Sequence, residues 1–240
     1  ESISTHRATI FFKCDSPEQF MPDPDDIEIA LSLERFCRYV AWAGGDRQRA
    51  VDLYSLSARL SEALYIPVHG LEIALRNRIH MVMSEAEGEL WFDTDGLLLA
   101  PHQMEQLVTA KADIAEAGKE ITAGRLVAAL SFSFWTAMFS PAYEPLWRKT
   151  LNRIAETEDG KRLARKSFSR PMTQIRLLRN RTAHHEPILH WNLAKHHRNI
   201  VQLTGWLSPA VSRWVAMMDR FEAVMSEGYV LAEAESDDAG

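Results

Sequence analysis

The stretch RLLRNRTAHHEPI, residues 176–188, combines a helical pattern of apolar side chains with a high density of polar chemistry. Ile175 and Leu178 stand at the spacing of one helix face, which is expected to turn toward a buried core. Pro187 disfavours the helical conformation in the residue before it, so the helix predicted for Pro171–His185 has to end there. The polar residues of the stretch are therefore expected at the C-terminal end of a helix.

Three polar side chains of this helix are expected to form one stripe. Arg176, Asn180 and His184 follow one another at intervals of four residues, which places them on the same helix face. Arg179 lies about 100° around the helix from Asn180, and its long side chain is expected to reach the same groove. The sequence therefore predicts a guanidinium, an amide and an imidazole around one small space.

This set of side chains fits the cleavage of RNA without a metal ion. A phosphodiester in RNA carries its own nucleophile, the 2′-hydroxyl group, so cleavage needs a base, an acid and positive charge near the phosphate. His184 is the predicted base or acid near neutral pH, Arg179 the predicted phosphate ligand, and Asn180 the residue that orients either one. A structural role is the alternative, because the dipole at a helix C-terminus also favours cations.

The charge of the chain is unevenly distributed. Its 240 residues carry a net charge of −6 at pH 7, so the whole molecule is not expected to attract nucleic acid. Segment 145–182 differs, because it holds eleven lysines and arginines and three acidic residues. Such a segment is typical either of a phosphate-binding surface or of a solvated helix face. The predicted RNA-binding residues in this segment are Arg165, Lys166, Arg170 and Arg181.

The periodicity of apolar residues is helical along almost the whole chain. A first helix is expected from Asp25 or Asp26 to the pair Gly44–Gly45, and Pro67 is expected to break or kink the chain after a second one. Only residues 8–13 have a weak strand pattern. The other predicted helices are Asp46–Leu64, Val68–Met83, Pro101–Ala117, Gly124–Phe139, Pro145–Glu156, Gly160–Ser167, Pro171–His185, Asn192–Leu207 and Pro209–Ser226.

One all-α domain is the simplest organisation. We expect it over 25–228, preceded by an N-terminal arm, 1–24, and followed by a disordered acidic tail, 229–240. The chain has only two cysteines, and no charged-then-apolar leader opens it, which favours an intracellular, cytoplasmic protein. The longest apolar stretches, such as 126–138, fall short of the roughly 20 residues needed to cross a bilayer, so no membrane span is expected.

The residues RNRTAHHEP, 179–187, resemble the Arg-x4-6-His signature of the HEPN superfamily, with four residues between Arg179 and His184. More narrowly, the chain is similar to the Abi-like, or abortive-infection, family of HEPN proteins. Further anchors of this resemblance occur in the order that the family shows, and together they span about residues 30–207. These anchors are Leu71–His80, Trp91–Phe92, Leu130–Trp135 and His185–Ile188.

The resemblance implies an all-α, HEPN-like up-and-down helical bundle with additional helices. It implies a homodimer that joins two Arg/His motifs and cleaves RNA without a metal or other cofactor, as a toxin or phage-defence effector with an antitoxin protein as a candidate partner. The catalytic positions of the family fall on Arg179, Asn180 and His184. His185 and Glu186 match the Abi-like extension and, with Arg176, are candidate supporting residues.

Two alternatives to an enzyme stay open. A non-catalytic HEPN module would bind RNA, a nucleotide or a partner protein. A purely structural helical scaffold would use the Arg/His helix only for capping and pairing. The histidines near this helix do not favour a zinc site, because they lack the paired spacing of a known one. They are His184, His185, His190, His196 and His197.

Two other groups of residues have structural interpretations. Glu72 and Arg76 stand four residues apart and are expected to form an ion pair on a helix surface, although Arg76 or His80 would also fit the edge of the predicted groove. The aromatic residues of the most apolar helix are expected in the core, where they would not stack on bases. They are Phe132, Phe134 and Trp135, with Met138 beside them.

Overall fold

The computed structural model describes residues 24–31, 33–157 and 160–233. These residues are predominantly helical, which confirms the predicted all-α class. They contain no strand beyond one isolated bridge between Glu156 and Arg162. The weak strand pattern at 8–13 lies outside the described residues. The chain divides into two compact units between Tyr54 and Ser55, whereas we predicted a single domain over 25–228.

The first unit contains α1 (Pro24–Leu31), α2 (Leu33–Trp42) and the beginning of α3 (Arg47–Glu87). Gly44 and Gly45 both have positive φ angles, 65° and 96°, and they end α2 as the sequence predicts. The rings of Tyr39 and Tyr54 meet edge to face with their centroids 5.2 Å apart. The buried apolar residues of this unit are Phe36, Tyr39, Ala43, Ala50 and Val51.

Helix α3 is continuous over 41 residues and contains Pro67 in its interior. The predicted break at this proline is wrong. A proline inside a helix lacks an amide donor and costs about 3 kcal/mol. The apolar residues on both sides of Pro67 belong to one buried face, and their burial offsets this cost because each contributes about 1.5–3 kcal/mol. These residues include Leu60, Leu64, Val68, Leu71 and Leu75.

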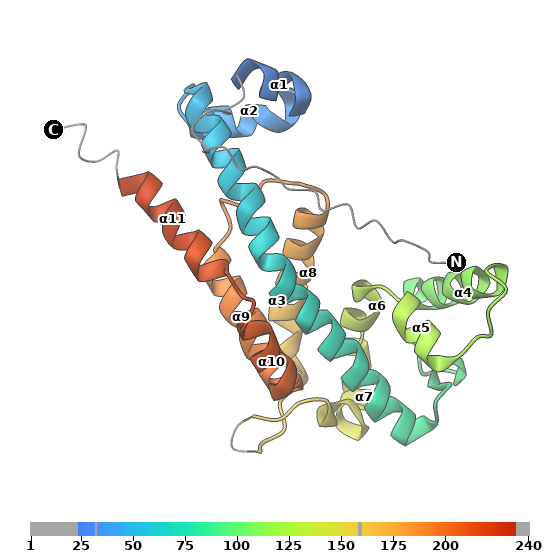
Figure 1. Cartoon of the computed structure of the whole chain (residues 1–240). Coiled ribbons are helices and arrows are strands. Elements are labelled where there is room, and N and C mark those ends of the chain that lie inside the picture. The colour runs from blue at the N-terminus through green and yellow to red at the C-terminus, as the bar shows by residue number, and fades with distance from the viewer. Residues whose placement is uncertain (1–23, 32, 158–159, 234–240) are drawn as a thin grey trace, which may run out of the picture. The chain divides into compact units, whose positions relative to one another are not determined.

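The second unit places the rest of α3 beside helices that come much later in the chain (Figure 1). These are α8 (Arg165–Ala183), α9 (Leu193–Leu207), α10 (Pro209–Ala216) and α11 (Phe221–Glu233). Helix α9 packs against both α8 and α10. At Gly70 in α3 a side chain would meet a methyl group of Val215 in α10 at 2.4 Å, so the missing side chain permits a close approach. Arg59 and Glu227 pair between α3 and α11.

The remaining helices of the second unit come from the middle of the chain. Helix α4 (Pro101–Glu116) packs against α5 (Ala123–Ala129) and α6 (Phe132–Ala137), and the 3-10 turn η2 (Trp91–Asp93) precedes them. We predicted one helix over Gly124–Phe139, but Leu130 and Ser131 are extended and divide it into α5 and α6. The division lets apolar side chains on both pieces enter the core. Phe132, Phe134, Trp135 and Met138 are all buried, as predicted.

Segment 141–164 differs from the prediction of two helices. It contains η3 (Pro141–Tyr143), α7 (Glu144–Lys149) and η4 (Leu151–Arg153), and no helix covers residues 160–164. Helix α8 begins at Arg165 and continues through Pro171, which we had placed at its start. Phe168 and Met172 on either side of this proline are buried, so packing again favours a continued helix.

The C-terminal helices follow local signals closely. The side chain of Asn192 accepts a hydrogen bond from the amide of Lys195 at 3.0 Å and caps the start of α9. Both ends of α9 lie where the sequence predicts. The helix predicted over 209–226 is divided instead, because the Asp219 side chain accepts a hydrogen bond from the amide of Phe221 at 2.9 Å and starts α11. Helix α11 includes residues 229–233 of the predicted tail, and 234–240 lie outside the described residues. Among the described helices, none combines the length and apolar character that a bilayer requires.

Candidate functional site

The polar stretch of the sequence lies at the C-terminal end of α8, as predicted. The amide of His185 donates to the carbonyl of Thr182 at 3.2 Å, and the amide of Glu186 donates to the carbonyl of Arg181 at 2.9 Å. This pair of bonds is the Schellman arrangement, which needs a left-handed residue after the helix. His185 fills that position with φ of 56°, where glycine is the usual residue.

The three predicted catalytic residues are all accessible at this end of α8. His184 is exposed and forms the C-terminal cap, while Asn180 is partly buried one turn earlier. The side chain of Arg179 is 42% exposed, and its Nε lies 3.9 Å from a carboxylate oxygen of Glu72 in α3. Among the described residues, no hydrogen bond or ion pair joins Arg179 to His184. The structure therefore brings the three residues to one end of a helix without forming a closed network.

Glu72 has a different partner from the one that its sequence position suggests. We predicted an ion pair with Arg76 in the same helix, but the pairing in the structure is with Arg179. The Nε atom of Arg76 is buried and has no hydrogen-bond partner among the described residues. Sequence reasoning missed the Glu72–Arg179 contact because the spacing rule for helices reports only neighbours in the same helix.

Arg181 holds the loop that follows α8. Its Nη1 donates to the carbonyl oxygen of Pro187 at 3.0 Å, and its Nη2 lies 3.4 Å from a carboxylate oxygen of Glu186. Its guanidinium also lies over the ring of Trp191, 5.3 Å from the ring centroid. These contacts fix the path of the chain after His185. The predicted RNA-binding role of Arg181 therefore competes with a structural one.

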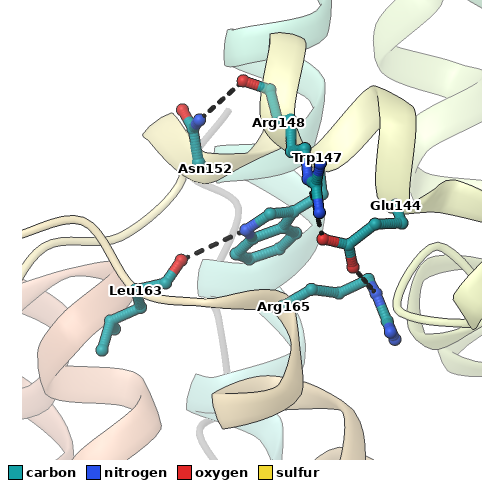
Figure 2. A network of polar contacts seen from close by, with 6 residues as sticks. All are labelled: Glu144, Trp147, Arg148, Asn152, Leu163 and Arg165. Carbon is teal, nitrogen blue, oxygen red and sulfur yellow. Dashed lines mark hydrogen bonds and ion pairs between the residues drawn. The ribbon is translucent and has the colours of Figure 1, made fainter.

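Arg165 is placed differently from the other predicted RNA-binding residues. Its side chain is only 7% exposed. Its Nε donates to a carboxylate oxygen of Glu144 at 2.7 Å. Figure 2 draws this contact. Its Nη1 donates to the backbone carbonyl of Phe139 at 2.5 Å. The hydrogen bond from Arg165, followed by one from Arg148, lowers the pKa of Glu144 below its ordinary value. Arg165 thus joins α8 to α7. Because its side chain is buried against these partners, it is not accessible to RNA, and the RNA-binding role predicted for it is not supported.

The other cations of α8 remain accessible. Lys166 and Arg170 are exposed, and neither has an ion-pair partner within the described part of the chain. Arg176 is partly buried and lines a cavity between α4, α6 and α8. The structure therefore separates the predicted basic residues into those held by protein contacts and those that a ligand can reach.

Several histidines near the site belong to the interior. His197 is buried, with its Nε2 2.6 Å from a carboxylate oxygen of Asp219. Burial, and then the charge of Lys195, lower the pKa of His196, whose buried Nδ1 has no hydrogen-bond partner among the described residues. Trp91 donates from its indole nitrogen to Nδ1 of His80 at 3.1 Å, and burial lowers the pKa of His80. His80 is partly buried and accepts this hydrogen bond from the fully buried Trp91.

No metal-binding cluster is found among the residues that the structure describes, in the sense of three or more His, Cys, Asp or Glu side chains that converge on one point. The groups at the end of α8 are instead a guanidinium, an amide and an imidazole. Such groups can bind an anion and transfer a proton near neutral pH. Comparisons with protein-family models, with curated proteins and with solved structures find no match for this chain.

Proposed function

We propose that this protein is a metal-independent endoribonuclease of the HEPN type, which acts as a toxin or abortive-infection effector. The observation that supports this proposal most directly is the accessibility of Arg179, Asn180 and His184 at one end of α8. A structural role would use these groups to cap the helix and to pair with Glu72, and their exposure leaves them accessible to a ligand as well. The Arg-x4-His spacing and the other sequence anchors add the HEPN resemblance.

In the proposed reaction, the 2′-hydroxyl group of the RNA attacks the adjacent phosphorus atom and the bond to the 5′-oxygen breaks. His184 takes the proton from the 2′-hydroxyl or supplies one to the leaving oxygen. Arg179 binds the phosphate and stabilises the charge of the transition state, while Asn180 orients one of these groups. The products are a 2′,3′-cyclic phosphate and a free 5′-hydroxyl group.

The site is expected to be completed by a second copy of the chain. Residues five positions apart in a helix point in directions that differ by about 140°. Arg179 faces Glu72 in α3, and His184 is exposed at the cap. A homodimer that brings two ends of α8 together supplies the arginine of one chain and the histidine of the other. The exposed cations Lys166 and Arg170 provide positive charge along the same helix.

The test is RNA cleavage in the presence of EDTA. We expect the unaltered protein to cut RNA, and the Arg179→Ala and His184→Ala variants to lose about 100-fold or more of the rate. Arg213→Ala is the matched control, because Arg213 is an exposed arginine in α10. Circular dichroism checks that each variant folds. Cleavage that needs a divalent metal, or that persists in both site variants, would contradict the proposal.

A test in cells addresses the proposed biological role. Induced expression of the unaltered chain should arrest growth, and the His184→Ala variant should not. Growth arrest by both forms would show that toxicity does not depend on the histidine. A cytoplasmic location and an antitoxin partner stay predictions of the same model.

One observation favours a non-catalytic alternative. The carboxylate of Glu72 lies close to Arg179 and neutralises part of the charge that a phosphate would meet. A module that binds RNA without cutting it would show salt-sensitive binding and no cleavage product. The EDTA experiment, run together with a binding assay on the same RNA, separates the two functions.

A further inference from the structure

A partly open cavity of about 450 Å³ lies on the other part of α8, away from the Arg/His end. Its walls come from α4, α6, the segment after α6, and α8. The volume falls within the range of about 300–1,000 Å³ that is typical of sites for small organic ligands. Arg179, Asn180 and His184 are not among its lining residues, but Arg176, a candidate supporting residue of the catalytic site, lines the cavity one helical turn before Asn180.

The lining carries one fixed positive charge, that of Arg176. Arg176 comes from α8 and His102 from α4, and the lining contains no aspartate or glutamate. Arg176 is partly buried, yet its guanidinium has no hydrogen bond or ion pair with the described residues. Arg165 in the same helix is fully engaged with Glu144 and a carbonyl group. The donors of Arg176 are therefore left for an anionic ligand in the cavity.

Hydroxyl groups line the cavity together with Arg176 and His102. One face of α8 contributes Ser169, Thr173 and Arg176 to the lining. Ser140, in the segment after α6, contributes another hydroxyl group. The Thr173 hydroxyl donates to the carbonyl of Ser169 at 2.9 Å. The hydroxyls of Ser169 and Ser140 have no hydrogen-bond partner within the described part of the chain and can donate to a ligand. Arginine, histidine and hydroxyl donors without a carboxylate are the groups that bind a phosphate.

The cavity also has an apolar side. Phe139 and Pro141 line it, and the ring of Phe139 is held in place by stacking on Phe168, with centroids 5.4 Å apart. A bare inorganic anion would leave this surface and most of the volume unused. From these features we propose that the cavity is a binding site for a phosphomonoester, whose phosphate meets Arg176 and His102 and whose organic part lies against Phe139 and Pro141.

This binding site goes beyond the proposed nuclease function and does not depend on it. The ligand has two sources of the same chemistry, which are a free small molecule such as a nucleoside monophosphate and the 5′-phosphate end of an RNA strand. Both present a dianionic phosphate on an organic group. Binding of a free monophosphate, compared with binding of RNAs that carry a 5′-phosphate or a 5′-hydroxyl group, distinguishes these sources.

The first experiment measures the binding of adenosine 5′-monophosphate to the full chain by calorimetry, with adenosine as the probe that lacks the phosphate. We expect the monophosphate to bind more tightly than adenosine. Arg176→Gln should weaken it about 10- to 100-fold, because a charge-assisted hydrogen bond is lost. Arg213→Gln, on exposed α10, should leave it unchanged. Equal binding of the two probes, or no effect of Arg176→Gln, would overturn the proposal.

A second variant tests the site in case Arg176→Gln loses monophosphate binding only because it misfolds. Thr173 is exposed in the middle of α8, so Thr173→Glu is expected to fold normally while it places a carboxylate beside Arg176. This variant should abolish binding of the monophosphate. Binding that survives Thr173→Glu with unchanged affinity would contradict the site.

The third experiment uses a short RNA with either a 5′-phosphate or a 5′-hydroxyl group, on the Arg179→Ala, His184→Ala double variant so that the RNA stays intact. Tighter binding of the phosphorylated RNA that disappears with Arg176→Gln supports an RNA end as the ligand. Equal binding of both RNAs, together with Arg176-dependent binding of the monophosphate, supports a free small molecule. Absence of cleavage by the unaltered protein would leave these binding results interpretable.

Discussion

Arg165 at the beginning of α8 and Arg179 near its end are the same residue type in the same helix, but their surroundings differ. The side chain of Arg165 is 7% exposed and lies 2.7 Å from the carboxylate of Glu144, whereas that of Arg179 is 42% exposed and 3.9 Å from the carboxylate of Glu72. The contacts of Arg165 stabilise the fold, whereas the side chain of Arg179 is accessible to a ligand. A count of basic residues along the helix does not distinguish these two roles.

The backbone at the two ends shows the same contrast. At the beginning of α8, Arg165 joins the helix to Glu144 of α7 (Figure 2), and it also donates to the carbonyl of Phe139. At the end, His185 takes a left-handed conformation, which glycine adopts at a lower energy cost than a residue with a side chain. Strained residues often persist where they serve a function. The contacts at the beginning of α8 therefore stabilise the fold, whereas the left-handed conformation of His185 at its end lowers the free energy of unfolding.

Replacing Arg165 tests the first half of this comparison and has the largest expected effect on stability. Arg165→Met keeps the apolar part of the side chain but removes a buried guanidinium that pairs with the partly exposed Glu144 and donates to the carbonyl of Phe139. We expect the free energy of unfolding to fall by about 2–3 kcal/mol. Urea denaturation measures this change. Arg213→Met is the control, and equal stability of both variants would show that the Arg165 contacts contribute little.

Relieving the strain at the other end should change stability in the opposite direction. His185→Gly keeps the Schellman hydrogen bonds and removes the steric cost of the left-handed conformation. We expect the free energy of unfolding to rise by about 1 kcal/mol. The same urea experiment applies. A decrease in stability would indicate that the His185 side chain makes a favourable contact that outweighs the strain.

The Arg165–Glu144 pair also predicts a dependence of stability on pH. Its hydrogen bond lowers the pKa of Glu144, so the stabilisation is fully present above the ordinary pKa of about 4.5 and is lost as the pH falls through the lowered value. Unfolding by urea, measured between about pH 6 and pH 3, should show a smaller pH dependence for Glu144→Gln. Arg165→Met should have the same effect on the slope. A slope unchanged in both variants would contradict this account.

Removing the carboxylate beside Arg179 has the smallest expected effect. In the His184→Ala background, Glu72→Gln should tighten RNA binding by no more than about fivefold, because a partly exposed ion pair is worth about 1 kcal/mol or less. Fluorescence anisotropy with a labelled RNA measures the affinity. Glu62→Gln is the control, since Glu62 is an exposed residue of α3 that pairs with Arg220. Weaker binding after Glu72→Gln would show that Glu72 supports the site.

Local signals predicted the elements whose ends depend on nearby residues. Asn192 caps α9, the pair Gly44–Gly45 ends α2, and Pro187 follows the end of α8, each at the expected place. The chain does not break at Pro67, one of the two outcomes predicted there, and the single helix predicted across Leu130–Ser131 is wrong. In both cases the burial of apolar side chains against distant helices outweighed the local preference.

The candidate site shows the same limit. Arg179, Asn180 and His184 were placed at one helix end from their spacing and from Pro187, and the structure finds them there. Glu72 and the lining of the Arg176 cavity were missed, because their neighbours come from other helices. The spacing of Ser169, Thr173 and Arg176 on one face was a signal for the cavity, but it did not reveal the opposite wall.

The sequence by itself determined that the chain is helical and that an arginine, an amide and a histidine gather where α8 ends, because helix periodicity, caps and prolines act over a few residues. Only the tertiary structure decided which arginine is buried, which one a ligand can reach, and where a proline leaves a helix intact. These properties depend on burial and on partners from distant segments, whose contacts form only when the helices pack.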